Sequence, residues 1–186
     1  MRGLAVVNPG ILSLIQDLGR QGAAHLGLSP GGPADLHAFC WGNKLLGNCP
    51  NAAGIEITVG PASFSALADM TIAITGAPML AKIDGTPQSN WHKFELKQGQ
   101  RLSFDSATSG LRTYITVAGG LAAPKVFGSA ATVCRNQLGG LATTGNVIGL
   151  GNKLQPGDVI SLAHLPLSHP PHINHFVPRR YIPQYP

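Results

Sequence analysis

The chain has 186 residues and a formal net charge of +5 at pH 7, and this length favours one sizeable hydrophobic core over two very small ones. Only 11% of the residues are charged, whereas glycine and proline number 24 and 15, which favours short strands joined by turns over a helical protein. Apart from Arg179 and Arg180 the basic residues are scattered, which argues against a phosphate-binding stripe and a nucleic-acid partner.

The first third of the chain predicts two short strands followed by one helix. GLAVVNPG is typical of a strand that ends in an Asn-Pro-Gly turn, and ILSLIQDLG is typical of a second short element. We expect the principal helix at residues 33–46, because Pro33 suits a first helical position and apolar residues then recur at helical spacing. Gly47 is the expected stop.

From Ile55 onward the pattern predicts strands. The runs IEITV, ADMTIAITG and MLAKID are short and bounded by glycine, proline or aspartate, and Asp84 with Gly85 forms a two-residue hairpin signal. HKFELK alternates apolar and charged residues, as in a strand with one buried face. Strands at this regular spacing with one helix predict a mainly β fold, a closed or nearly closed β-barrel, since closure removes exposed edges.

Two segments lack a strand or helix pattern. Residues 128–151 are rich in glycine, alanine and threonine, and a loop of this length is usually functional or mobile. Residues 166–186 hold six prolines, so we expect a barrel domain at residues 1–165 followed by a proline-rich linker or tail. No metal site is expected there, because such a segment gives no rigid scaffold on which its histidines converge: His164, His169, His172 and His175.

The cysteines and the hydropathy pattern indicate a cytoplasmic protein. Cys40, Cys49 and Cys134 are odd in number and lack metal-ligand spacing, which favours reduced thiols, with an intermolecular disulfide as the alternative. No apolar run approaches the ~18 to 20 residues that cross a bilayer, and the N-terminus lacks signal-peptide features, so we expect no membrane partner.

The stretch QDLGRQG concentrates polar groups at the end of a predicted strand. Gly19 permits a tight turn that brings Asp17 and Arg20 within reach of each other, leaving Gln16 to hydrogen-bond a ligand. Arg20 can present part of its planar donor fork to a carboxylate or phosphate. The alternative is a buried ion pair that pins the loop, and the local sequence favours neither.

A second candidate is the predicted helix start in SPGGPAD. Gly31 and Gly32 let backbone amides approach a ligand closely, and a helix N-terminus directs unpaired N–H groups at an anion. Asp35 competes for the same donors, so an ordinary helix start with a favourable acid is equally compatible with the sequence.

Three further residues are candidates for a supporting role. Glu56 is a lone acid in an apolar strand and needs a partner, for which Arg112 is suitable; such a pair is more often structural than catalytic. Tyr114 can stack on or hydrogen-bond a ligand, although a core aromatic with a satisfied hydroxyl is the commoner case.

Several motifs occur in one order along nearly the whole chain: QDLGRQG, SPGGPAD, GNKLLGN, Glu56, GPASF, ITGA, LRTYITVAGG and FGSAAT. This series resembles the family of the 5-oxoprolinase C-subunit, also described as KipA-like, allophanate hydrolase subunit 2-like, or the biotin-dependent carboxyltransferase domain. The resemblance implies a cyclophilin-like β-barrel that takes part, within a multi-subunit complex, in the ATP-dependent opening of 5-oxoproline to glutamate, or in a related carboxyltransferase. KipA-like relatives imply an alternative, a regulatory module that binds a kinase-inhibitor partner protein.

The sequence also departs from this family. The usual chain is about twice as long, with two related barrels, so the resemblance covers the N-terminal half only and implies a missing second barrel. Ala130 and Ala131 stand where relatives usually carry a basic residue, and residues 139–151 look lengthened and altered. These departures predict that this chain alone is inactive.

No phosphate-binding GxxxxGK[ST] motif, nucleophile elbow or biotin-attachment Met-Lys-Met occurs. We therefore expect no cofactor on this chain, with ATP or carboxybiotin supplied through partner subunits, and we assign no catalytic residue. The resemblance favours a functional role for the polar motifs, whose residues are expected to bind substrate: Gln16, Asp17, Arg20, Gly31, Gly32 and Asp35. Glu56, Arg112 and Tyr114 are expected to support the site.

Overall fold

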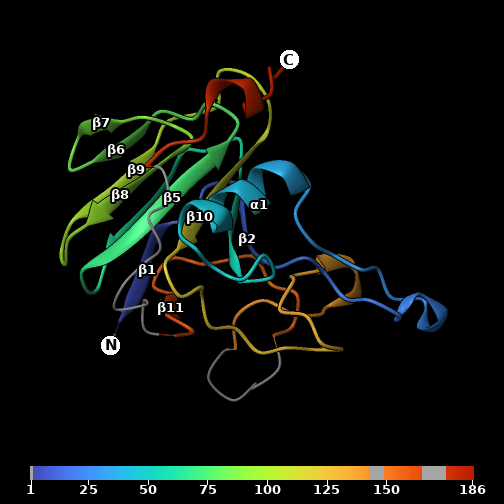
Figure 1. The fold of residues 1–186 in the computed structure, drawn as a ribbon. Coiled ribbons are helices and arrows are strands. Elements are labelled where there is room, and N and C mark those ends of the chain that lie inside the picture. The colour runs from blue at the N-terminus through green and yellow to red at the C-terminus, as the bar shows by residue number, and fades with distance from the viewer. Residues whose placement is uncertain (1, 143–148, 165–174) are drawn as a thin grey trace.

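The computed structural model describes residues 2–142, 149–164 and 175–186. Its strands form two antiparallel sheets (Figure 1). The first sheet has the order β11 (Val159–Ser161), β1 (Gly3–Asn8), β4 (Ala62–Ala66), β9 (Arg101–Phe104), β6 (Ala81–Ile83) and β7 (Thr86–Gln88). The second has the order β2 (Leu12–Gln16), β3 (Gly54–Thr58), β10 (Arg112–Val117), β5 (Met70–Gly76) and β8 (His92–Leu96).

The mainly β fold with one principal helix is confirmed, but the described strands remain two sheets and do not close into a single barrel. Two edges are instead covered by segments outside the regular strands. Thr132 N donates to Ile15 O on the edge strand β2, and Lys93 N on the edge strand β8 donates to His175 O. Because these edges already have partners, closure is not needed to protect them.

The main core lies between the two sheets. Alternation along β3 sends Ile55 and Ile57 into this core, where they join residues of the first sheet such as Leu4 and Phe64. Glu56, between them, points to the opposite face, which carries the helix. A second, smaller cluster packs there around Phe39.

The helix α1 (Leu36–Leu45) lies across β5 and β10 on the outer face of the second sheet (Figure 1). It begins three residues later than predicted, because Asp35 is the N-cap and accepts a hydrogen bond from Ala38 N at 3.0 Å. Close packing needs Gly42, where a Cβ atom would lie 2.8 Å from Thr116 Oγ1. Gly47 ends the helix in a left-handed conformation, as predicted.

The hairpin signal at Asp84 and Gly85 is also confirmed. These residues join β6 to β7, whose register pairs Ile83 with Thr86, and both have positive φ angles, 47° and 83°. That geometry is what an Asp-Gly turn between twisted strands requires.

Residues 175–186 lie against the body of the domain, whereas composition predicted a linker or tail. Val177 is 2% exposed within the cluster under α1, and the Tyr185 hydroxyl donates to Asp35 Oδ2 at 2.7 Å. The segment contains η3 (Arg179–Tyr181) and ends beside Gly110, whose N–H donates to Pro186 O. The proline content of the segment did not predict these contacts. The rest of the predicted tail, with His169 and His172, lies outside the described residues.

Candidate functional site

The QDLGR stretch forms a buried polar corner at the end of β2. Gln16, Asp17 and Arg20 are 3%, 1% and 2% exposed. The Asp17 carboxylate accepts hydrogen bonds from Gly19 N at 2.9 Å, Ser129 Oγ at 2.5 Å and Ala130 N at 2.7 Å. Asp17 therefore fastens the loop that begins at Gly128 onto the strand end.

Arg20 binds a different set of groups from the one predicted. Its guanidinium donates to backbone oxygens of four residues: Ser29, Pro30, Val126 and Ala131. The shortest of these bonds runs from Nη2 to Ala131 O at 2.7 Å. Burial lowers the pKa of Arg20, and the nearby charge of Asp17 raises it again in part. Among the described residues no ion pair joins Asp17 to Arg20, because carbonyl groups occupy the guanidinium instead.

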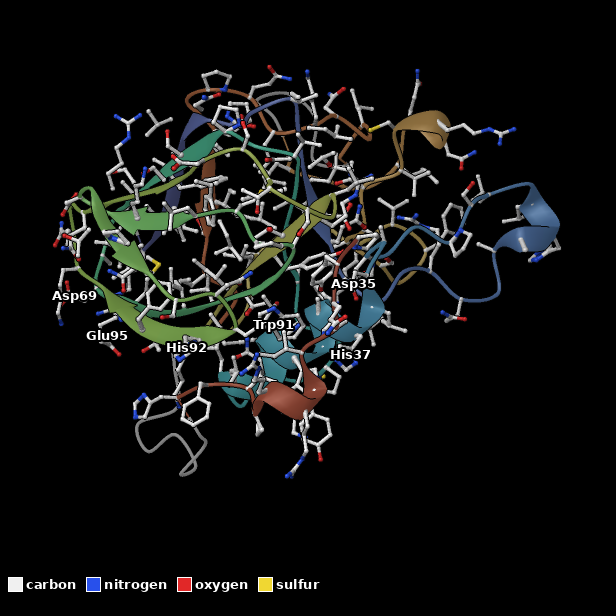
Figure 2. The ribbon with its side chains drawn as sticks, turned by 90° about the horizontal axis from the view of Figure 1, so that it is seen from above. Asp35, His37, Asp69, Trp91, His92 and Glu95 are labelled. Carbon is white, nitrogen blue, oxygen red and sulfur yellow. The ribbon has the colours of Figure 1, made fainter. Side chains whose placement is uncertain are left out.

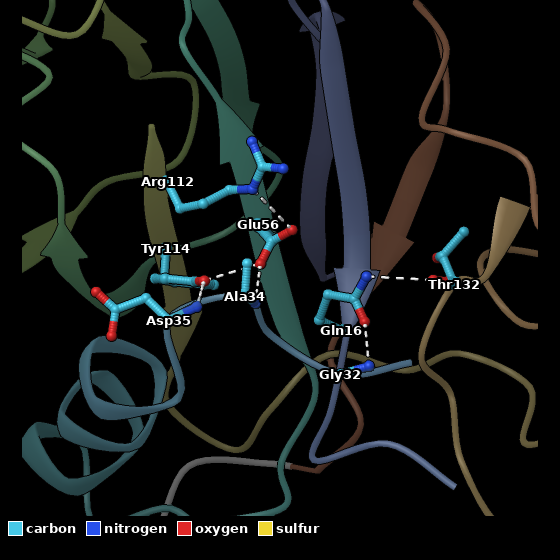
Figure 3. Close-up of polar contacts among 8 residues, drawn as sticks. All are labelled: Gln16, Gly32, Ala34, Asp35, Glu56, Arg112, Tyr114 and Thr132. Atoms are coloured by element: carbon cyan, nitrogen blue, oxygen red, sulfur yellow. Dashed lines mark hydrogen bonds and ion pairs between the residues drawn. The ribbon is translucent and has the colours of Figure 1, made fainter. Parts of the chain in front are cut away.

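The predicted glycine loop packs against this corner. Gly32 N donates to Gln16 Oε1 at 3.1 Å, and the Gln16 Nε2 amide in turn donates to Thr132 O at 3.2 Å (Figure 3). A Cβ atom on Gly19 would lie 2.8 Å from Gly31 O. The polar bend and the helix start are thus neighbours, as expected. The glycines, which were predicted to let the backbone approach a ligand, let the two backbone segments approach each other.

Three N–H groups at the helix start already have side-chain acceptors within the protein. Ala34 N donates to Glu56 Oε2 at 2.8 Å, and Asp35 N donates to the Tyr114 hydroxyl at 2.7 Å (Figure 3). Ala38 N donates to the Asp35 side chain. An external anion would have to displace these acceptors, so substrate binding by Gly31, Gly32 and Asp35 stays a prediction.

Glu56 connects this helix start to the sheet. Its Oε1 lies 3.4 Å from Arg112 Nε, the expected ion pair, although the approach lacks hydrogen-bond geometry. Its Oε2 accepts a hydrogen bond from the Tyr114 hydroxyl at 2.8 Å. Burial and the negative charge of Glu56 raise the pKa of Tyr114 well above its ordinary value, so the hydroxyl stays protonated and keeps donating.

A cavity of about 1310 Å³ lies beside the corner, and residue patterns did not predict it. Most of its described lining comes from the loop after α1 (residues 46–53), the strand β8 (residues 93–95), the loop after β10 (residues 118–125) and β11. Asp17 is the one predicted site residue in that lining. Two of these segments overlap motifs noted in the sequence: GNKLLGN runs into the loop after α1, and VAGG runs into the loop after β10. Neither motif indicates a binding site by itself.

The described lining of the cavity mixes apolar surface with a few charged groups. Ala118 to Ala123 give a small-residue wall, while Lys93 and Lys125 bring positive charge and Glu95 brings negative charge. Glu95 accepts a hydrogen bond from Thr71 Oγ1 at 2.8 Å. A concave apolar site with a few placed polar groups is the usual form of a small-molecule site.

The chain matches the carboxyltransferase domain family, subdomain A and B, over residues 26–185. It belongs to this family. The carboxyltransferase domain is 34% identical to the 5-oxoprolinase C-subunit of Escherichia coli over 154 residues, which cover 83% of this chain and 49% of that protein. It is 35% identical to urea amidolyase of Saccharomyces cerevisiae over 152 residues, 81% of this chain and 8% of that protein. The chain therefore spans about half the length of the bacterial relative.

Solved structures agree with this assignment. The urea amidolyase of K. lactis superposes with a TM-score of 0.87 at 25% identity, covering 100% of this chain and 11% of that chain. The Kluyveromyces lactis urea carboxylase superposes with a TM-score of 0.85 at 26% identity, covering 100% of this chain and 16% of that chain. The two-sheet arrangement with one crossing helix is therefore the arrangement of a carboxyltransferase domain.

Other features bear on partners and metals. Within the described ranges, no group of three or more histidine, cysteine or acidic residues is placed to hold a metal ion. No helix in this part of the chain is long and apolar enough to span a membrane. All three cysteines are free thiols, and Cys49 and Cys134 are exposed.

Proposed function

We propose that this carboxyltransferase domain works in a 5-oxoprolinase-type complex that opens 5-oxoproline to glutamate, and that the cavity beside Asp17 takes the substrate. The proposal is supported by two relatives named as the 5-oxoprolinase C-subunit, those of Escherichia coli and Haemophilus influenzae, each 34% identical over more than four-fifths of this chain. The cavity carries the proposal, because Gln16 and Arg20 in the corner and three N–H groups at the helix start already have hydrogen-bond partners inside the protein.

The chemistry of the substrate fits the polar groups of the cavity. 5-Oxoproline presents one carboxylate and one lactam amide. Lys125 supplies positive charge for the carboxylate. Asp17 Oδ2, which among the described residues accepts only Ala130 N, keeps lone pairs for the lactam N–H. Opening the ring breaks the C–N bond while water delivers a hydroxyl to the carbonyl carbon and a proton to the nitrogen.

In this proposal the energy of ATP enters through other chains. No phosphate-binding loop motif occurs in the sequence, so partner subunits bind the ATP, and the complex works in the cytoplasm, where ATP is available. In a related carboxyltransferase reaction, carboxybiotin would likewise arrive on a partner. The cavity would then serve as the place where the acceptor amide is held.

Reconstitution tests the proposal. The purified chain is mixed with its candidate partner subunits, ATP and 5-oxoproline, and glutamate release is measured with and without this chain. Release that depends on the chain, and that is lost in Ala163→Trp, supports a role for the cavity, since Ala163 is an exposed residue of its lining. Ala24→Trp, on the exposed turn η1 (Ala24–Leu26), is the matched control and should keep activity. Glutamate release without this chain would remove the enzymatic proposal.

A second candidate function is a regulatory binding module of the KipA-like kind, and the outer face of α1 favours it. Leu36 is 56% exposed and Tyr181 is 42% exposed; the tilted rings of Trp41 and Tyr181 have centroids 5.2 Å apart, and Lys44 Nζ lies 4.4 Å from the centroid of the Trp41 ring. The His37 ring lies 6.4 Å from the Trp41 ring and 6.0 Å from the Trp91 ring, centroid to centroid, and Figure 2 shows His37 near Trp91. Exposed aromatic groups beside cations are typical of protein-binding surfaces. Stable co-purification with a partner, and no activity in any reconstituted mixture, would favour this function.

A further inference from the structure

Three asparagines organise the loop of residues 46–53, which forms one wall of the cavity. Two of them use their whole side-chain amide inside the protein. Asn43 Nδ2 donates to Ala52 O at 3.0 Å, and Asn43 Oδ1 accepts from Asn48 Nδ2 at 3.0 Å. Asn48 also donates to Val117 O and accepts from Gly119 N at 2.9 Å, which ties this loop to the loop after β10. These two residues are structural.

Asn51, the third asparagine, uses only half of its side-chain amide. Its Oδ1 accepts a hydrogen bond from Leu18 N at 2.8 Å, inside the QDLGR corner. None of the described residues accepts a hydrogen bond from Asn51 Nδ2, and the residue lines the cavity. Because Leu18 N can only donate, it fixes the oxygen of the amide towards the corner and leaves two N–H donors on the other side.

We propose that Asn51 is a ligand-binding residue whose Nδ2 donates to the carbonyl oxygen of a planar amide bound in the cavity. The inference deepens the proposed function and rests on it for the identity of the ligand, a lactam. It also gives the QDLGR corner a role: the Leu18 N–H positions the donor without touching the ligand. The corner is then a positioning element, held rigid by the Asp17 and Arg20 hydrogen bonds.

The donor makes the cavity selective for ligands that carry a carbonyl oxygen. A site built to hydrogen-bond a substrate group discriminates against an analogue without that group, since the site's own polar atom is left unpaired. 2-Pyrrolidinone is a neutral lactam, and 5-oxoproline is the same ring with a carboxylate. Proline has the carboxylate and the ring but no carbonyl in it, so it should bind more weakly than 5-oxoproline.

The test measures binding of these three compounds to the full chain by titration calorimetry. Asn51→Asp keeps an acceptor for Leu18 N and removes both donors, while Asn152→Asp makes the same change at an exposed position. We expect Asn51→Asp to weaken 2-pyrrolidinone and 5-oxoproline about tenfold, equivalent to about 1.4 kcal/mol, and Asn152→Asp to leave both unchanged. Because 2-pyrrolidinone has no net charge, repulsion between two ionic groups cannot explain its loss.

A second measurement needs no variant. In the wild-type chain, the two side-chain N–H resonances of Asn51 should shift on addition of 2-pyrrolidinone and stay in place on addition of proline. Equal dissociation constants for wild type and Asn51→Asp, no binding of either lactam, or unmoved Asn51 resonances would overturn the inference. If 2-pyrrolidinone binds through Asn51 and reconstituted complexes still release no glutamate, the proposed function fails alone and the carbonyl site stands.

Discussion

The Tyr114 hydroxyl should contribute about 3 kcal/mol to the free energy of unfolding. It donates to the buried Glu56 carboxylate at 2.8 Å and accepts from Asp35 N at 2.7 Å, so it joins the sheet to the start of α1. Tyr114→Phe removes one oxygen and keeps the ring, which packs edge-to-face on Phe39 with centroids 5.8 Å apart. The substitution therefore tests the two hydrogen bonds with little change in packing.

The magnitude follows from the two bonds. A hydrogen bond to a charged group contributes about 1.5–3 kcal/mol, and a partly buried N–H left without an acceptor costs about 1 kcal/mol or more. The sum is about 3 kcal/mol. For a chain of this size each kcal/mol moves the melting temperature by roughly 2–4 °C, so we expect a fall of about 6–12 °C.

Urea unfolding gives the direct measurement, because a change in the midpoint at constant slope reports stability alone. Tyr181→Phe is the matched control: Tyr181 is 42% exposed and none of the described residues hydrogen-bonds its hydroxyl, so a change within about 0.5 kcal/mol is expected. If Tyr114→Phe is no more destabilising than Tyr181→Phe, the Glu56 network does not hold the helix start in the way described.

Three further predictions concern pH, the C-terminal segment and the corner. The folded-state pKa of Tyr114 is raised, so above about pH 10 the unfolded chain loses a proton that the folded chain keeps, and the unfolding free energy should fall by up to about 1.4 kcal/mol per pH unit. Tyr114→Phe should reduce that slope in alkaline urea titrations. Val177→Ala should destabilise the docked segment by about 2 kcal/mol, seen as faster hydrogen exchange at the Lys93 amide but not at Ile115 in the central strand β10. Arg20→Lys should cost about 3 kcal/mol in urea unfolding because an ammonium cannot reach four carbonyls, whereas Arg135→Lys at an exposed position should cost almost nothing.

Local chemistry was sufficient to predict the features that depend on neighbours in sequence or on a single unpaired group. The Asp84 and Gly85 turn needs only its own backbone geometry. The Glu56 and Arg112 pair was predictable because a charge in an apolar strand requires a partner. The helix lies where it was predicted, but it begins later. The sequence did not show that Asp35 would cap the helix from just outside it instead of standing in its first turn.

Features that depend on distant contacts could not be predicted in this way. Arg20 binds carbonyl groups as far away as Ala131, 111 residues along the chain, and sequence spacing gave no preference for these over Asp17. The anchoring of Val177 required knowledge of the apolar cluster under α1. The cavity is assembled from segments that are far apart in the sequence, none of which shows a site pattern by itself.

Asp17 links the corner that the sequence pointed to with the cavity that the structure contains. Its carboxylate fixes Ser129 and Ala130, and Ala130 also lines the cavity. The backbone of the next residue, Leu18, holds Asn51, which belongs to the wall formed by residues 46–53. A polar corner held together by these internal hydrogen bonds can keep two walls of a cavity at a fixed distance. Substitutions that loosen the corner, such as Arg20→Lys, should therefore weaken ligand binding in proportion to the stability they remove, while Asn51→Asp should weaken binding with little loss of stability.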